Sequence, residues 1–163
     1  LQDGARVEDV LNQLNGPMYR KTEKRMFTAI CLAVLDTVAG VFTFANAGLN
    51  EPIHVRDGRV AALGGVGSRL PLGVQSDNRY QQRAVSLEPG DVVVLCTDGI
   101  TEARNSAGDF YTEQRLRVLL AELDTLTLSA FHIRQAIMEH VQRFTRGAIQ
   151  HDDMTVVVLK YTG

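Results

Sequence analysis

Few of the residues that stabilise small secreted domains occur in this sequence of 163 residues, which has no Trp, two Cys and four Pro. Cys31 and Cys96 both lie in apolar runs, where a free thiol behaves as a small hydrophobic side chain. The lack of a disulfide framework favours a reducing, cytoplasmic location. Cys96 lies close to Asp98, but a nucleophilic thiol needs an electropositive and accessible setting, which the neighbouring residues do not supply.

Long apolar runs and an excess of one charge are also absent. No run approaches the ~20 apolar residues of a membrane-spanning helix and no charged-then-apolar leader is present, so we expect no membrane partner. The net charge of −2 provides no basic field for nucleic acid. A hydrophobic content of 45% and a charged content of 22% are ordinary for a soluble globular protein, and the length favours a single domain over residues 1–163.

Helical periodicity occurs at the start of the chain and again after Gly99. Residues 6–20 carry apolar side chains at helical spacing, and the Gly16-Pro17 pair predicts that this helix ends near Asn15. Residues 112–123 and 129–144 predict two further helices, the second with Ser129 as its N-cap and Gly147 after its end.

Strand patterns fill the middle of the chain and its end. They cover residues 26–35, 41–45, 52–56, 59–63, 80–87, 91–97 and 154–161. Turn residues predict antiparallel pairing of successive strands, with Asp57-Gly58 as the clearest two-residue turn and a further pair formed by 80–87 and 91–97. The Gly-rich stretch 64–73 predicts a loop.

The order of these elements predicts an antiparallel α+β fold rather than alternating βαβ units. The runs that begin at Asp91 and at Met154 are apolar at consecutive positions, which is typical of strands covered on both faces. A layered β-sandwich with helices on its outside provides that cover.

Two aspartate motifs stand at the ends of these apolar runs. Asp98 follows one strand and Asp152 precedes the other, so antiparallel pairing would bring the two carboxylates to the same edge. Carboxylate oxygens at a strand end are ligands for hard cations such as Mg²⁺ or Mn²⁺. Ordinary turn chemistry also explains each motif taken alone, because Asp-Gly is common after a strand.

Several motifs, in order along the chain, resemble the SpoIIE-type branch of the PP2C-like (PPM) metal-dependent serine/threonine protein phosphatases. They are Met26-Phe27-Thr28-Ala29, Asn46-Ala47-Gly48, Pro71-Leu72-Gly73-Val74, Leu87-Glu88-Pro89-Gly90-Asp91, Thr97-Asp98-Gly99-Ile100-Thr101-Glu102-Ala103 and His151-Asp152-Asp153-Met154-Thr155. The resemblance covers nearly the whole chain.

This resemblance implies a double β-sandwich flanked by helices that holds two Mn²⁺ or Mg²⁺ ions and hydrolyses phosphoserine or phosphothreonine on a protein, often an anti-sigma factor antagonist. Asp98 and Asp152 match its metal ligands, and Asp153 matches the position that supports the ligand. We expect Gly99 to adopt a positive φ that lets Asp98 point outward. His151 is a candidate general acid through a water, or a solvated residue beside the strand.

The chain also departs from the family pattern. Leu49 stands where the family has His, and the N-terminal Gly-Asp and Asp-x-x-Gly-x-Gly motifs have no match. The chain thus resembles the C-terminal three-quarters of the domain, and an upstream sensor domain is expected in the parent protein. Two alternatives stay open: an inactive regulatory or scaffolding module that binds a phosphorylated partner, and a homodimer that covers incomplete sheets.

Overall fold

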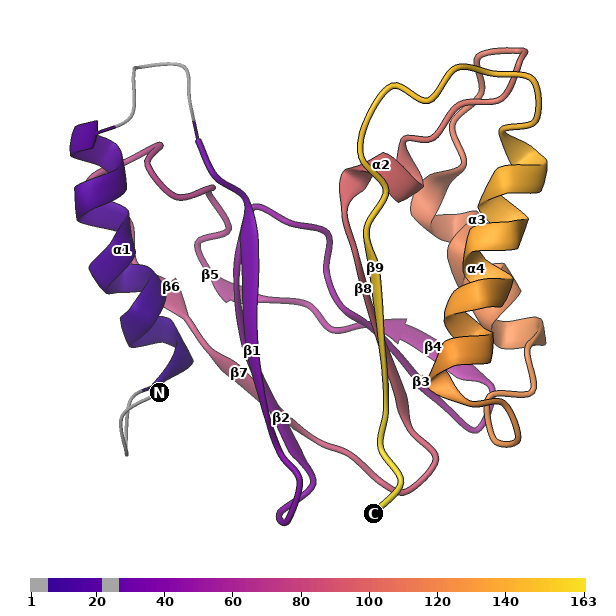
Figure 1. Ribbon diagram of the computed structural model, residues 1–163. Coiled ribbons are helices and arrows are strands. Elements are labelled where there is room, and N and C mark those ends of the chain that lie inside the picture. Colours follow the sequence, from indigo (N-terminus) through magenta and orange to yellow (C-terminus); the bar gives the residue numbers. More distant parts are fainter. Residues whose placement is uncertain (1–5, 22–26) are drawn as a thin grey trace. The chain divides into compact units, whose positions relative to one another are not determined.

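The computed structural model describes residues 6–21 and 27–163 (Figure 1). Met26, the predicted start of the first strand, lies outside these described residues. The chain divides into two compact units, one of residues 1–49 and 64–87 and the other of residues 50–63 and 88–163. The elements are α1 (Val7–Lys21), β1 (Ile30–Asp36), β2 (Val41–Ala47), β3 (Ile53–Arg56), β4 (Arg59–Ala62), β5 (Val66–Gly67), β6 (Tyr80–Gln81), β7 (Arg83–Ser86), β8 (Val92–Cys96), α2 (Asp98–Thr101), α3 (Thr112–Glu122), α4 (Ala130–Phe144) and β9 (Val156–Lys160).

The first unit is built on the antiparallel sheet β1-β2-β7. The predicted hairpin of the first two strands is confirmed, with Ile30 opposite Ala47 and Asp36 opposite Val41. Helix α1 packs Val7 and Leu11 into a core that also contains Ala45, Ala47, Leu72 and Tyr80. The expected loop at 64–73 contains the short strand β5, which pairs with β6.

A polar stripe on α1, formed by Glu8, Asn12 and Asn15, binds the backbone of residues 73–82. The backbone N–H of Gln82 donates to Glu8 Oε2 at 2.7 Å, and that of Tyr80 donates to Asn12 Oδ1 at 2.8 Å. The fully buried Asn15 donates to the carbonyl of Gln75 at 2.8 Å and accepts from the N–H of Gly73 at 3.1 Å. These bonds satisfy backbone groups of a segment that has little regular structure of its own.

The predicted end of the first helix near Asn15 is wrong, because α1 continues to Lys21 with Pro17 inside it. Proline removes one helical hydrogen bond and disfavours a helix interior. The buried Asn15 side chain, bound to the 73–78 segment on one side of Pro17, and the packing of Met18 on the other keep the chain helical through it. Tertiary contacts therefore outweigh the local signal.

The second unit is the antiparallel sheet β4-β3-β8-β9, with α3 and α4 on one side of it (Figure 1). Asp57 and Gly58 form the predicted two-residue turn, with φ of 49° and 73°. Ser129 caps α4 as predicted, since its side chain accepts a bond from the N–H of His132. The core joins the strands to the two helices through Val92, Val94, Leu116, Leu120, Ile133, Ile137 and Val141.

The predicted pairing of residues 80–87 with 91–97 is wrong. Strand β7 pairs with β2 in the first unit, whereas β8 pairs with β3 and β9 in the second. The turn between them is held by other partners, because the N–H of Leu87 donates to Gly40 O at 2.7 Å and that of Gly90 to Tyr161 O at 2.8 Å. Long-range strand partners thus replace the local hairpin.

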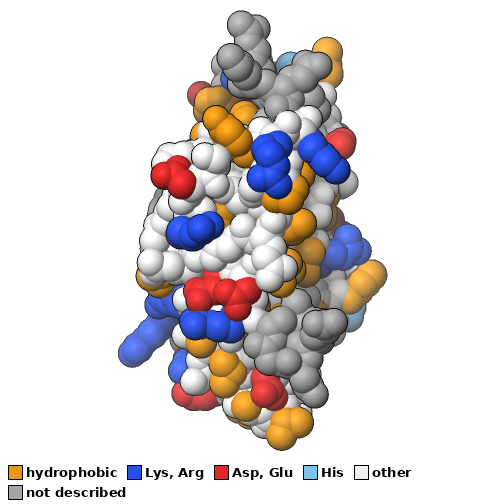
Figure 2. Space-filling view, turned by 90° about the vertical axis from the view of Figure 1, so that its left-hand side faces the viewer, with side chains coloured by type: hydrophobic (Ala, Val, Ile, Leu, Met, Phe, Trp, Pro, Cys, Tyr) orange, Lys and Arg blue, Asp and Glu red, His pale blue; other side chains and the backbone are white. Residues whose placement is uncertain are grey.

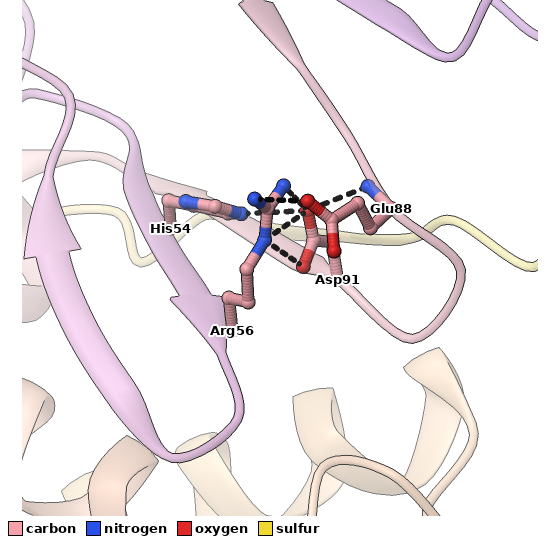
Figure 3. A network of polar contacts seen from close by, with 4 residues as sticks. All are labelled: His54, Arg56, Glu88 and Asp91. Carbon is pink, nitrogen blue, oxygen red and sulfur yellow. Dashed lines mark hydrogen bonds and ion pairs between the residues drawn. The ribbon is translucent and has the colours of Figure 1, made fainter.

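A network of polar contacts around the buried Asp91 fixes the start of β8 (Figure 3). Asp91, 2% exposed, accepts bonds from Arg56 Nε at 2.9 Å and from the N–H of Glu88 at 2.9 Å, and lies 3.0 Å from His54 Nε2. Burial raises the pKa of Asp91, but the bonds from Arg56, the Glu88 backbone and His54 outweigh it, so the pKa lies below its ordinary value. Asp91 is a structural carboxylate.

The face of the molecule in Figure 2 carries charges of both signs. Lys and Arg side chains lie among Asp and Glu side chains, with hydrophobic side chains between them. The described residues on this face therefore form no extended surface of one sign. None of the helices in the described part of the chain combines the length and the apolar character that crossing a bilayer requires.

Candidate active site

The two aspartate motifs meet at the same end of two neighbouring strands, β8 and β9, in the sheet of the second unit. Strands β8 and β9 are antiparallel, with Cys96 opposite Val156 as their last pair. Beyond that pair, the N–H of Thr97 donates to Thr155 O at 3.1 Å and the N–H of Thr155 donates to Thr97 Oγ1 at 3.0 Å. The segment that enters β9 consequently lies beside α2, which begins at Asp98 (Figure 1).

Asp98 and Asp152 are both exposed and lightly bound. Asp98 Oδ1 accepts from the N–H of Gly99 at 3.0 Å, and Asp152 Oδ1 accepts from the N–H of Asp153 at 2.7 Å. Each bond involves only the adjacent residue and one oxygen of the carboxylate. The donor chemistry therefore suits a hard divalent cation.

Among the residues that the structure describes, the protein donors fall short of a complete metal centre. Over residues 6–21 and 27–163, no three His, Cys, Asp or Glu side chains are grouped closely enough to hold an ion. Asp98 and Asp152 fit one side of a carboxylate centre, in which waters or other ligands take the remaining positions.

Gly99 is required for a reason other than the predicted one. It does not adopt a positive φ. Instead, a Cβ placed on Gly99 would lie 2.2 Å from the carbonyl oxygen of Asp153, far inside van der Waals contact. The expectation of a left-handed Gly99 is wrong, and its small size lets the first turn of α2 lie directly against the Asp153 backbone.

Asp153 contacts its neighbours through its backbone. Its N–H donates to Asp152 Oδ1, and its carbonyl oxygen accepts from Thr97 Oγ1 at 3.1 Å. The Asp153 side chain is exposed. Its predicted support of Asp152 by the side chain stays a prediction, whereas the backbone N–H orients the Asp152 carboxylate.

Sequence reasoning missed Thr97 as a positioning residue. Its hydroxyl accepts from the N–H of Thr155 and donates to the carbonyl of Asp153, so a single side chain joins the two aspartate segments. Gln150 also contributes, since its Nε2 donates to Asp152 O at 2.8 Å. The signal in the sequence was the presence of a Thr in both motifs: Thr97 directly precedes Asp98, and Thr155 follows Asp152 and Asp153.

A pocket of about 630 Å³ opens beside Asp152. Its lining consists of Gly99, Glu102, Ala103, Arg104, Phe110, Met138, Gln142, Thr145, Ala148, Ile149, Gln150, His151, Asp152 and Met154. His151 is exposed and is one of the lining residues. Its part as a general acid stays a prediction.

Cys96 is unsuited to nucleophilic catalysis. The side chain is 8% exposed, and burial raises the pKa of its thiol to about 11. The neutral thiol is a poor nucleophile near neutral pH. Cys96 instead belongs to the apolar core beneath the site.

A match to the family described as Stage II sporulation protein E (SpoIIE) covers residues 1–162. The chain belongs to the SpoIIE family. This membership confirms the SpoIIE-type resemblance seen in the sequence motifs.

Curated relatives of the SpoIIE-family chain are longer than it is. It is 29% identical to the phosphoserine phosphatase RsbU of Bacillus subtilis, over 98% of this chain and 46% of RsbU. It is 27% identical to Protein IcfG of Synechocystis sp., over 82% of this chain and 20% of that protein. The chain therefore spans less than half of the length of either relative.

Solved structures confirm the fold class. The PP2C phosphatase domain of SpoIIE from Bacillus subtilis, solved with a fragment of its regulatory domain, has a TM-score of 0.81 and 22% identity, over 98% of this chain and 46% of that one. A Mn-presoaked structure of the SpoIIE phosphatase domain from the same organism has a TM-score of 0.70 and 22% identity, over 99% of this chain and 68% of that one. The predicted antiparallel α+β, PP2C-like fold is confirmed.

Proposed function

We propose that this chain forms part of a metal-dependent protein serine/threonine phosphatase. Its substrate is phosphoserine or phosphothreonine on a regulatory protein, of which an anti-sigma factor antagonist is the favoured class. The pairing of β8 with β9, which brings the Asp98 and Asp152 segments together through Thr97, carries the proposal. Family membership and the name of RsbU, a phosphoserine phosphatase, support it.

Asp98 and Asp152 would hold Mn²⁺ or Mg²⁺ on the side of the centre that this chain supplies. The use of manganese in the SpoIIE phosphatase-domain structure supports that choice of ion. The chemistry that two bound ions supply is neutralisation of the phosphoryl charge and acidification of a water.

Other residues of this chain hold the two aspartate segments together and orient the Asp152 carboxylate. Thr97 and the Gly99 contact fix the distance between the two aspartate segments, and the Asp153 N–H sets the rotamer of Asp152. In the proposal His151, which lines the pocket beside Asp152, would pass a proton to the leaving serine oxygen through a water.

In this proposal, residues 1–163 are a single phosphatase domain that corresponds to the C-terminal three-quarters of the family's domain. The remaining acidic ligands and a sensor domain are expected upstream in the parent protein. The protein acts in the cytoplasm on a phosphorylated protein, and a homodimer is compatible with the open edges of β4 and β9.

Titration calorimetry with Mn²⁺ tests the metal assignment. The parent protein, with the region preceding Leu1 included, should bind Mn²⁺, and Asp98→Ala should weaken binding by more than about tenfold. Glu139→Gln, an exposed carboxylate on the outer side of α4, is the matched control and should leave the affinity unchanged. Equal Mn²⁺ affinity for both variants would contradict the assignment of Asp98.

An inactive phosphatase-like module that binds a phosphorylated partner is the second candidate, favoured by Leu49 in place of the family's His. Hydrolysis of phosphopeptides and of an aryl phosphate separates the two. If the folded parent protein binds phosphopeptides but hydrolyses neither substrate, the inactive module is the correct assignment and the phosphatase is not.

A further inference from the structure

Large apolar side chains stand exposed at the pocket beside Asp152. Ile149, in the loop after α4, is 81% exposed, and Phe110, in the loop before α3, is 43% exposed. Both line the same pocket. An isolated exposed apolar residue needs no explanation, but two that line one concavity indicate a surface that binds something apolar.

The interior of the pocket is adaptable and has room. Met138 and Met154 line it and are half-buried, packed at their other side against the core of the second unit. Methionine is flexible and polarisable, so it adjusts to side chains of different shape. Ala103 and Ala148 add small apolar walls that leave space unfilled.

Charges at the pocket do not favour an acidic or a basic occupant. Glu102 and Asp152 lie on its lining with Arg104, so both signs are present. The Arg104 guanidinium lies 4.5 Å from the centre of the Phe110 ring, a cation–π contact that keeps it against the wall. Gln142, Thr145 and Gln150 add uncharged polar groups, and the apolar side chains of Phe110, Met138, Ile149 and Met154 on the same lining are those that an aliphatic side chain would contact.

We propose that this pocket binds a large aliphatic side chain that flanks the phosphorylated residue of the substrate protein. The inference rests on the proposed function, because Asp152, His151 and the backbone of Gly99 line the same pocket. A phosphoryl group held next to Asp152 by a metal ion would bring the neighbouring residues of its own chain to the pocket that Met138 and Met154 line. The pocket selects substrates by sequence as well as by the phosphate.

Matched peptides test the inference. Labelled peptides carry a non-hydrolysable phosphonate analogue of phosphoserine, with Leu or Ser placed in turn at each flanking position. In the presence of Mn²⁺, fluorescence anisotropy should show about tenfold tighter binding of the Leu peptide at one flanking position, which corresponds to about 1.4 kcal/mol. A gain in binding free energy of this size is what the partial burial of one aliphatic side chain contributes.

Two further measurements locate the effect. In the protein labelled at methionine methyl groups, the Leu peptide should shift the signals of Met138 and Met154 and leave that of Met18, in the first unit, unchanged. Ile149→Ser should remove the Leu preference, whereas Leu126→Ser, 59% exposed and outside the pocket lining, should keep it.

Equal binding of the Leu and Ser peptides at every position, with no shift at Met138 and Met154, would overturn the pocket assignment. Hydrolysis of an aryl phosphate by the natural protein, measured in parallel, reports on the proposed function alone. A Leu preference without such hydrolysis would support the pocket assignment and contradict the proposed phosphatase function. Hydrolysis without a Leu preference would support the phosphatase function and contradict the pocket assignment.

Discussion

An aspartate lies just beyond each end of strand β8, and the two carboxylates, those of Asp91 and Asp98, differ in burial and in bonding. Asp91 is 2% exposed and accepts bonds from Arg56 and the Glu88 backbone, with His54 also in contact. Asp98 is exposed and accepts a bond from the N–H of the next residue. Removal of a buried carboxylate that is surrounded by donors destabilises the fold, whereas an exposed carboxylate with few bonds can bind a cation.

Removing each carboxylate in turn gives the largest expected contrast. Asp91→Ala leaves Arg56 and His54 without their shared partner, and we expect the free energy of unfolding to fall by about 3 kcal/mol. Asp98→Ala should change it by less than about 0.5 kcal/mol, as is usual for an exposed side chain. Urea unfolding followed by circular dichroism measures both, and similar losses for the two variants would break the comparison.

The Asp98 end depends on backbone contact rather than on ion pairs. A methyl group at Gly99 would meet the Asp153 carbonyl, so Gly99→Ala should cost about 2 kcal/mol of stability and displace the segment that carries Asp152. Gly65→Ala is the control, because its Cβ would meet nothing closer than Arg69 at 3.8 Å. Unchanged stability and unchanged Mn²⁺ affinity in Gly99→Ala would show that the contact is dispensable.

The pH dependence of stability provides a smaller test of the Asp91 end. Because the pKa of Asp91 is lowered in the folded protein, its contribution to stability is complete above the unfolded value of about 3.9 and is lost as pH falls through the folded value. Asp91→Asn should therefore show a shallower loss of stability below about pH 4 than the natural protein. Parallel acid-unfolding curves for the two proteins would contradict this assignment.

The sequence allowed prediction of the elements near the site because their signals are local. Asp57-Gly58 determines its own turn, Ser129 caps α4, and the apolar runs that became β8 and β9 leave their aspartates at one edge by simple alternation of direction. The placement of Asp98 and Asp152 was predicted on the condition that these two strands pair antiparallel, and the pairing of Cys96 with Val156 meets that condition. Their role as metal ligands remains a prediction of the family resemblance.

The errors arose where distant residues decide the local structure. Pro17 remains helical because Asn15 is held by a segment some sixty residues away, with separations of 58 and 60 positions. Strands β7 and β8 are joined by a short turn but do not pair with each other, because β7 pairs with β2 and β8 pairs with β3. Gly99 was assigned a positive φ because sequence shows which residue is small, but not which backbone lies against it.

The polar stripe on α1 has a consequence for how related sequences diverge. Glu8, Asn12 and Asn15 bind mainly backbone atoms of residues 73–82, and the side chains of Val74, Gln75, Ser76 and Asp77 are exposed. Substitutions at those exposed positions leave the anchoring bonds intact, because every amino acid has a carbonyl group to offer. We therefore expect this stretch to drift freely among homologues while the two asparagines of the helix persist.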